Sequence, residues 1–320
     1  MPNRNCLLIT RRLPPAAEAR AESTYDVRRW DRCGPTLAEA AAGVDALLCT
    51  PADRLDAAVI AALPGGVRVI GTFSVGFEHI DLAAARTRFI AVVNTPGVLS
   101  QATAEFTMLL ILAAARRAGE GERQLRAGQW RGWSPATFLG TQVGGKRLGI
   151  LGMGRIGQVL AHMARGFSMR VHYRNRHRLD PGVEAGAIWH ADDASFLAAC
   201  EILALCAPGG PETHHWLNGE RIALLPRGAV VVNTARGSLV DDASLVAALR
   251  DGHVVAAGLD VFPDEPHVPA DYMALENVVL TPHIASATWE TREAMGALVL
   301  DGIDAVLAGG RPGNLVEVEG

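Results

Sequence analysis

A glycine-rich motif directly after a short apolar run is the feature that most constrains the fold of this chain. Residues 147–157 read RLGILGMGRIG, so Gly152, Gly154 and Gly157 form the pattern Gly-x-Gly-x-x-Gly. The apolar run predicts a β-strand, and the following RIGQVLAHMARGF predicts a helix with one apolar face. We therefore expect a dinucleotide phosphate site at the N-terminus of this helix. The alternative is a purely structural strand–turn–helix corner.

The second strand of the expected unit ends in basic rather than acidic residues. Such a unit usually carries an acid about 20 residues after the glycines, which holds the hydroxyls of the adenosine ribose. Here the residues from His172 onward read HYRNRHRL, and no acid occurs before Asp180. A carboxylate would repel a 2′-phosphate, whereas guanidinium groups bind phosphate through charge-assisted hydrogen bonds. Arg174 and Arg176, with Asn175 as a neutral donor, therefore predict a 2′-phosphate pocket. This pocket favours NADPH over NADH, with NADH still possible; the alternative is a solvated basic loop.

Composition and charge restrict the class of protein. The chain has 320 residues, of which 49% are hydrophobic and 20% charged, which suits a globular protein of about two domains. Its net charge of −4 gives no reason to expect nucleic acid or a membrane as partner. The five cysteines lack metal-ligand spacing, so we expect buried free thiols and no metal site. No apolar stretch suits a signal peptide or a membrane span, so we expect a cytoplasmic protein.

Short runs of β-branched residues alternate with alanine- and leucine-rich stretches along the chain. This alternation is typical of βαβ units around a parallel sheet, so the expected fold class is α/β. Strands are expected at 6–10, 46–50, 67–71 and 90–94, and again at 147–151, 169–173, 201–206, 229–233, 254–258 and 277–281. The second set of six matches a complete doubly wound dinucleotide-binding (Rossmann) domain. The residues before it then form a separate, smaller α/β domain.

Two long helical stretches set the expected domain boundaries. The sequence SQATAEFTMLLILAAARRAGEG begins at Ser100, a candidate N-cap, and predicts one long helix that crosses between the domains. The stretch 288–307 predicts a final helix that returns to the first domain. We therefore expect a discontinuous smaller domain at 1–99 and 288–320. The dinucleotide-binding domain is expected at 100–287, including a helix and arm at 100–140.

Polar residues follow three further expected strands. The stretches NTARG, AGLDVFPDEP and TPHIASAT contribute Arg236, Glu265 and His283, respectively. The carboxyl ends of parallel strands are where open α/β sheets bind ligands. We therefore expect these three side chains to belong to one site. Each also has a structural alternative: an ion-pair arginine, a loop acid or a packed histidine.

In combination, these motifs resemble the D-isomer-specific 2-hydroxyacid dehydrogenases. The resemblance begins near Gly71, includes SVGFEHID at 74–81 and extends to the C-terminus. The arm GQWRGWSP, the HIASAT motif and the arginines after the second strand are most similar to glyoxylate/hydroxypyruvate reductases. The resemblance implies a flavodoxin-like substrate-binding domain. It also implies NADPH-dependent reduction of small 2-keto acids, such as glyoxylate and hydroxypyruvate, to 2-hydroxy acids of the D configuration where there is chirality.

The resemblance assigns roles that suit this chemistry. Reduction of a 2-keto acid needs hydride at the carbonyl carbon, a proton at its oxygen and a hold on the neighbouring carboxylate. Histidine is the natural proton donor near neutral pH, and the resemblance gives this role to His283. Glu265 would favour the imidazolium and fix the orientation of the ring. Arg236 would clamp the substrate carboxylate and polarise the carbonyl.

Further contacts with substrate and cofactor are implied by the same resemblance. The backbone N–H groups of Val75 and Gly76 would bind the substrate carboxylate, and Ser286 would contact the substrate through its hydroxyl. Asp260 would meet the nicotinamide carboxamide. Other cofactor contacts are expected around the glycine-rich loop and neighbouring strand ends, at Thr103, Gly152, Met153, Gly154, Arg155, Ile156, Gly157, Cys206, Ala207, Pro208, Thr213, Thr234 and Ala235.

The polar segment 119–140 carries Trp130 and Trp133. Exposed tryptophans usually mark an interface. The resemblance implies that this arm wraps a partner subunit in a homodimer, and that Trp133 reaches the partner's active site and limits substrate size. The alternative is that the tryptophans pack the arm onto its own domain.

Two other functions share these motifs. An NAD-dependent dehydrogenase of the D-lactate or phosphoglycerate type has the same core, but the basic residues at 174–178 argue against it. A dinucleotide-sensing regulatory protein, like the transcriptional corepressors that resemble this family, can keep the catalytic residues. Measured turnover of a 2-keto acid distinguishes the enzyme from such a regulatory protein.

Overall fold

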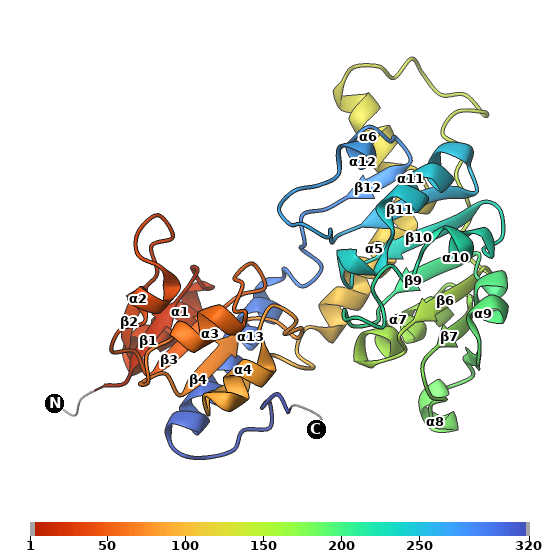
Figure 1. Ribbon diagram of the computed structural model, residues 1–320. Coiled ribbons are helices and arrows are strands. Elements are labelled where there is room, and N and C mark those ends of the chain that lie inside the picture. The colour runs from red at the N-terminus through yellow and green to blue at the C-terminus, as the bar shows by residue number, and fades with distance from the viewer. Residues whose placement is uncertain (1–3, 318–320) are drawn as a thin grey trace. The chain divides into compact units, whose positions relative to one another are not determined.

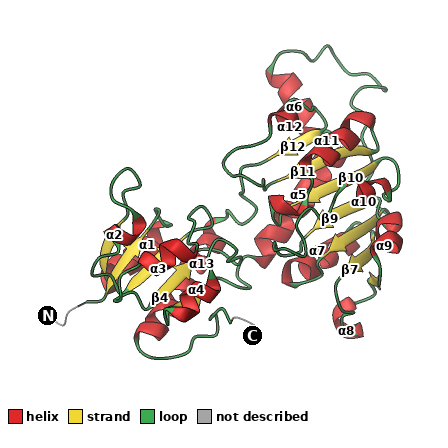
Figure 2. Cartoon of the chain, viewed as in Figure 1, coloured by secondary structure: helices red, strands yellow, loops and turns green. Residues whose placement is uncertain are grey.

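The computed structural model describes residues 4–317, which fold into two compact units (Figure 1). The chain up to Leu99 and the chain from Ala287 onward form one unit, and Ser100–Ser286 form the other. Each unit has a central parallel sheet with helices packed beside it (Figure 2). This arrangement confirms the predicted two-domain α/β class. Within the described residues, no helix is long and apolar enough to cross a lipid bilayer.

The first unit has five parallel strands in the order β2-β1-β3-β4-β5, which is the flavodoxin-like order. β1, β3 and β4 are buried along their whole length, which is why they could be predicted as apolar runs. β2 was not predicted, because its sequence Asp-Val-Arg-Arg lies largely exposed at the sheet edge. The strands are β1 (Cys6–Ile9), β2 (Asp26–Arg29), β3 (Ala46–Cys49), β4 (Val69–Thr72) and β5 (Ala91–Val93).

The C-terminal helix of the chain packs on this first sheet. Thr288 caps it, accepting a hydrogen bond from the N–H of Thr291 at 3.1 Å. The helix lies so close to β4 that a Cβ at Gly71 would be 2.8 Å from side-chain atoms of Val299 and Ile303. The helices of the unit are α1 (Pro15–Thr24), α2 (Leu37–Ala40), α3 (Ala57–Ala62), α4 (Leu82–Thr87) and α13 (Trp289–Leu307).

The second unit has seven parallel strands in the order β12-β11-β10-β9-β6-β7-β8. The sheet extends in both directions from β6, the strand before the glycine-rich loop, which is the doubly wound arrangement that was predicted. The additional strand β8 is only two residues long and lies at the edge. The strands are β6 (Arg147–Leu151), β7 (Arg170–Arg174), β8 (Ile188–Trp189), β9 (Ile202–Leu205), β10 (Ala229–Asn233), β11 (Val254–Leu259) and β12 (Val278–Leu280).

The expected single helix from Ser100 is two helices in the structure. Its first part begins at Ser100 itself, so Ser100 is not a cap, and it ends at Ala115. Arg117 then adopts a left-handed backbone with φ of 54°, which stops the helix. The helices of the unit are α5 (Ser100–Ala115), α6 (Ala118–Arg126), α7 (Arg155–Gly166), α8 (Pro181–Glu184), α9 (Asp193–Ala199), α10 (Gly219–Ala223), α11 (Asp242–Asp251) and α12 (Ala270–Met273), with a 3-10 turn at Gly237–Leu239.

All five cysteines carry free thiols. Three of them are buried and Cys206 is partly buried, as expected for thiols of a packed interior. Cys33 is exposed, so the expectation that all thiols are buried was wrong at this position.

Candidate active site

The glycine-rich loop joins β6 to α7, and close backbone contacts explain two of its three glycines. A Cβ at Gly152 would lie 2.6 Å from backbone atoms of Ala207, and one at Gly157 would lie 2.6 Å from the carbonyl oxygen of Gly152. A Cβ at Gly154 would meet no atom within 4 Å. Gly154 is the N-cap of α7 and provides no side-chain hydrogen bond, so no cap side chain satisfies the first N–H groups of this 12-residue helix. This arrangement fits an anionic phosphate group.

The side chain of Asn175 lies at this loop. Its Oδ1 accepts a hydrogen bond of 2.7 Å from the N–H of Met153. Asn175 directly follows β7, the strand whose end carries the ribose-binding acid in many dinucleotide domains. An uncharged amide therefore stands at the glycine-rich loop of this protein.

The three arginines at the end of β7 and just after it have different surroundings. Arg174 is mostly buried, and its Nε donates to Asp193 at 3.0 Å. Arg178 donates twice to Glu184, at 2.9 and 3.0 Å. The side chain of Arg176 is 82% exposed and lies 3.4 Å from a carboxylate oxygen of Glu212. Of these three, Arg176 is the one that faces solvent most openly.

His283 and Glu265 form a hydrogen-bonded pair at the ends of two adjacent strands. Nδ1 of His283 lies 2.7 Å from Oε2 of Glu265, and both side chains are about one-third exposed. The other carboxylate oxygen of Glu265 accepts from the N–H of Phe262 at 3.0 Å. Burial acts to raise the pKa of Glu265, but the hydrogen bond and charge of His283, the Phe262 N–H and the nearby Arg236 together lower it. Glu265 is therefore held as a carboxylate.

Asp260 fixes the loop that carries His283. Its side chain is fully buried and accepts hydrogen bonds from the hydroxyl of Thr281 at 2.6 Å and from the N–H groups of Ile284 and Ala285 at 2.9 and 2.8 Å. Its carbonyl oxygen also accepts from the N–H of His283 at 2.8 Å. Burial raises the pKa of Asp260, although these donors oppose the shift. Its predicted contact with the nicotinamide carboxamide stays a prediction.

Arg236 is placed by tight packing of the loop after β10. A Cβ at Gly237 would lie 2.0 Å from a backbone atom of Phe262, so this loop touches the loop that carries Glu265. Asn233 donates to the carbonyl oxygen of Arg236 at 2.8 Å, and NH1 of Arg236 donates to the carbonyl oxygen of Ala235 at 2.7 Å. The ends of β10, β11 and β12, which are neighbours in the sheet, thus supply Arg236, Glu265 and His283.

The other predicted cofactor residues lie mainly around the ends of β9 and β10. Thr234 shares a 2.7 Å hydrogen bond with Thr107 of α5, whose hydroxyl also donates to the carbonyl oxygen of Thr103. Thr213 donates to the carbonyl oxygen of Pro208 at 2.8 Å. Sequence reasoning did not identify Thr107 or Thr281, which hold these loops, because a threonine in a helix or after a strand gives no signal of its own. Among the described residues, no cluster of three or more metal-ligating side chains occurs.

The predicted substrate residues Val75 and Gly76 belong to the first unit, in the loop after β4. Asn94, directly after β5, donates to the carbonyl oxygen of Val75, and Ser74 of the loop donates to that of Gly76, so two side chains hold the loop. Their contact with the substrate carboxylate stays a prediction, as does that of Ser286. Trp133 is 84% exposed, so it does not pack the arm onto its own unit.

Comparisons with known proteins agree with this geometry. Residues 108–285 match the family described as D-isomer specific 2-hydroxyacid dehydrogenase, NAD binding domain. The chain is 45% identical to glycerate dehydrogenase of Hyphomicrobium methylovorum over 95% of this chain and 96% of that protein. It is 39% identical to glyoxylate reductase of Thermococcus litoralis over 97% and 96%.

Solved structures show the same similarity. A putative D-isomer specific 2-hydroxyacid dehydrogenase from Polaromonas is 46% identical, with a TM-score of 0.91 over 99% of this chain and 100% of that one. An NADPH-dependent glyoxylate/hydroxypyruvate reductase from Sinorhizobium meliloti, solved with NADP and malonate, is 30% identical. Its TM-score is 0.89 over 98% of this chain and 97% of that one.

Proposed function

This chain belongs to the D-isomer-specific 2-hydroxyacid dehydrogenases, and from that premise we propose that it is an NADPH-preferring reductase of glyoxylate and hydroxypyruvate. The family and its relatives make it an oxidoreductase of 2-keto and 2-hydroxy acids with an NAD(P)-binding domain. The observation that carries the proposal is the 2.7 Å hydrogen bond between His283 and Glu265 at the strand ends that also present Arg236.

His283 is the proposed proton donor to the substrate carbonyl oxygen. Glu265 binds Nδ1 of the ring, so Nε2 is the nitrogen that delivers the proton. The carboxylate of Glu265 stabilises the imidazolium before transfer and keeps the ring in one orientation. When bound, the reduced nicotinamide supplies the hydride to the carbonyl carbon.

Arg236 is the proposed anchor of the substrate carboxylate. A guanidinium group binds a carboxylate through two parallel hydrogen bonds, which orients the adjoining carbonyl. Its positive charge also stabilises the negative charge that develops on the carbonyl oxygen. Val75, Gly76 and Ser286 are proposed to add hydrogen bonds to the substrate, and Trp133 to limit its size from a partner subunit of a homodimer.

The NADPH preference rests on the residues after β7. Asn175 presents an amide to the glycine-rich loop, so no carboxylate repels a 2′-phosphate there. Arg176 is exposed beside it and free to exchange a long, solvent-exposed contact with Glu212 for a phosphate. The similar reductase from Sinorhizobium meliloti, described as NADPH-dependent and solved with NADP, supports this proposal.

The proposal is tested by incubating the enzyme with NADPH and either glyoxylate or hydroxypyruvate. Loss of absorbance of the reduced cofactor should accompany formation of glycolate or glycerate, identified by chromatography. An Arg236→Lys variant, which keeps the charge but loses the bidentate geometry, should show a strongly raised Michaelis constant for the keto acid. No turnover with any small 2-keto acid would contradict the proposal and favour a dinucleotide-sensing protein.

A further inference from the structure

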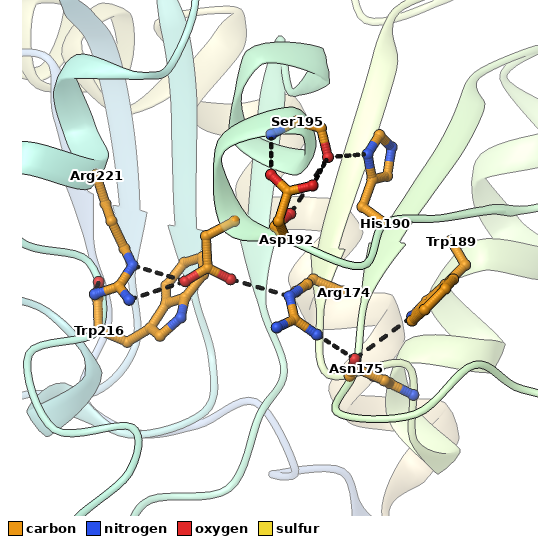
Figure 3. Close-up of polar contacts among 9 residues, drawn as sticks. Arg174, Asn175, Trp189, His190, Asp192, Ser195, Trp216 and Arg221 are labelled. Carbon is orange, nitrogen blue, oxygen red and sulfur yellow. Dashed lines mark hydrogen bonds and ion pairs between the residues drawn. The ribbon is translucent and has the colours of Figure 1, made fainter.

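The carboxylate of Asp193 joins Arg174 of β7 to Arg221 of α10, both labelled in Figure 3. Asp193 is the first residue of α9. One of its oxygens accepts from Nε of Arg174 at 3.0 Å, and the other accepts from Arg221 of α10 at 2.9 Å. Arg221 is itself held, because its guanidinium lies over the ring of Trp216 and donates to the carbonyl oxygen of that residue at 3.1 Å. Asp193 is therefore a fixed anchor for Arg174.

The guanidinium of Arg174 is used within the protein. Its Nε binds Asp193, and its NH1 donates to the carbonyl oxygen of the next residue, Asn175. The same carbonyl oxygen lies 3.5 Å from Nε1 of Trp189. The side chain of Arg174 is only 23% exposed. Its donors therefore hold the backbone of the turn after β7.

This turn determines what reaches the glycine-rich loop. With its carbonyl held by Arg174, Asn175 turns its side chain to accept from the N–H of Met153 at 2.7 Å. A continuous chain of contacts thus runs from Arg221 through Asp193, Arg174 and Asn175 to the loop. The next residue, Arg176, points to solvent, where its pairing with Glu212 is exposed on both sides and weak.

We propose that Asp193 is a positioning residue for cofactor binding, acting through Arg174 on the turn that presents Asn175 to the glycine-rich loop. In this division of roles Arg174 supports the turn, and Arg176 is the arginine left for a 2′-phosphate. Asp193 and Arg174 then serve the part of the site that NADPH and NADH share. The assignment of Arg176 rests on the NADPH preference proposed above, whereas the roles of Asp193 and Arg174 do not.

The first test compares Arg174→Gln with Arg176→Gln. Michaelis constants for NADPH and NADH are measured at saturating keto acid. Arg174→Gln should raise both constants by a similar factor of about ten, the size expected from losing one hydrogen bond to a charged group, with kcat within about twofold of wild type. Arg176→Gln should raise the NADPH constant alone. An increase confined to NADPH in Arg174→Gln would overturn the proposal, because Arg174 would then be a phosphate ligand.

The second test is a double-mutant cycle between Asp193→Asn and Arg174→Gln. If Asp193 acts through Arg174, either variant raises both cofactor constants, and the double variant is no worse than the more affected single variant. The proposal would be overturned if the Michaelis constants of the double variant rose by the product of the two single-variant factors. If Asp193→Asn does not fold, the comparison of Arg174→Gln with Arg176→Gln still decides the role of Arg174.

The matched control is Asp192→Asn. Asp192 is the N-cap of α9, one residue away from Asp193, and its carboxylate binds Ser195 rather than an arginine. Asparagine caps helices as well as aspartate does, so this variant removes one negative charge at the same helix end and leaves the turn intact. It should leave both cofactor constants unchanged. If Asp192→Asn raised the two Michaelis constants as much as Asp193→Asn does, the proposal would be overturned. The effect would then come from the loss of a negative charge at this helix end and not from the contact with Arg174.

The two proposals fail separately. If Arg176→Gln leaves the NADPH constant unchanged while Arg174→Gln raises both constants, the 2′-phosphate assignment fails and the positioning role stands. If Arg176→Gln is selective for NADPH but Asp193→Asn has no effect, the positioning role fails and the cofactor preference stands.

Discussion

Nδ1 of His283 lies 2.7 Å from Oε2 of Glu265, although the two residues are 18 positions apart in the sequence. Each follows a strand of the second sheet, and Asp260, directly after β11, accepts hydrogen bonds from the backbone N–H groups of His283 and of the two residues that follow it. The pair is therefore built into the sheet edge rather than formed by two mobile side chains. It orients the histidine before any substrate binds.

Replacement of His283 by alanine should remove proton transfer while leaving cofactor binding in place. Loss of a general acid typically lowers turnover by a factor of about 10² to 10⁴. We expect His283→Ala to reduce kcat for glyoxylate by such a factor and to bind NADPH with a dissociation constant within about threefold of wild type. Stopped-flow turnover and fluorescence titration of NADPH measure the two quantities. Unchanged turnover would remove His283 from the mechanism.

An acid introduced at Asn175 should reverse the cofactor preference. Asn175→Asp keeps the shape of the side chain and can still accept from the N–H of Met153, so the loop is retained. Its negative charge would repel a 2′-phosphate and offer an acceptor to the ribose hydroxyls of NADH. We expect the Michaelis constant for NADPH to rise at least about tenfold and that for NADH to stay or fall. Equal changes for both cofactors would show that Asn175 does not discriminate between them.

A histidine pair formed by buried His172 of β7 and partly exposed His190 should make stability depend on pH. Nδ1 of His172 lies 2.9 Å from Nε2 of His190, and His172 is almost fully buried. Burial, together with the neighbouring His190, Arg147 and Arg170, lowers the pKa of His172. Burial also lowers the pKa of His190, which Asp192 opposes. The folded protein holds both rings neutral. The free energy of unfolding therefore keeps its full value above pH 6.5, the ordinary pKa of histidine, and declines as the pH falls below it.

The measurement is the melting temperature between pH 8 and pH 5. Wild type should lose stability over the lower part of this range, and His172→Gln should lose less, because glutamine does not titrate. The parallel control is His253→Gln, since His253 pairs with the backbone oxygen of Ile222 outside this pair. A pH dependence that is the same in wild type and in His172→Gln would contradict this account.

A methyl group at Gly237 should disturb catalysis by displacing the loop of Glu265. The added Cβ would meet the backbone of Phe262 at 2.0 Å, and a backbone cannot rotate away as a side chain can. We expect Gly237→Ala to cost about 1–3 kcal/mol of stability and to lower kcat/KM by more than about tenfold. Gly65→Ala is the control, because a Cβ at Gly65 meets no atom within 4 Å. Wild-type activity in Gly237→Ala would mean that the contact between the two loops is not needed.

Most of the strands that could be predicted are buried on both faces. The apolar runs of β1, β6 and β10 are continuous because helices cover both sides of the sheet. The edge strands β2 and β8 escaped prediction, because an exposed Asp-Val-Arg-Arg or a two-residue strand has no apolar pattern. The break at Arg117 was likewise hidden, since no glycine or proline marks it.

The residues proposed to form the catalytic site left a stronger sequence signal than the proposed positioning residues. His283, Glu265 and Arg236 lie in short motifs after predicted strands, and the glycine pattern predicts the phosphate loop. Asp193 gave no signal, because an acid in the first turn of a helix is common and is normally explained by the helix dipole. Its contacts with Arg174 and Arg221 depend on how α9 and α10 fold back onto the sheet, which the order of residues does not reveal.

The most direct test of the central claim is the ratio of kcat/KM for NADPH to that for NADH in the reduction of glyoxylate by the wild-type enzyme. Both values are obtained from initial rates of absorbance loss at saturating keto acid. A ratio well above one, which falls towards one in Arg176→Gln, is the result that we predict. A ratio below one would contradict the account, because the arginines after β7 would then bind no phosphate.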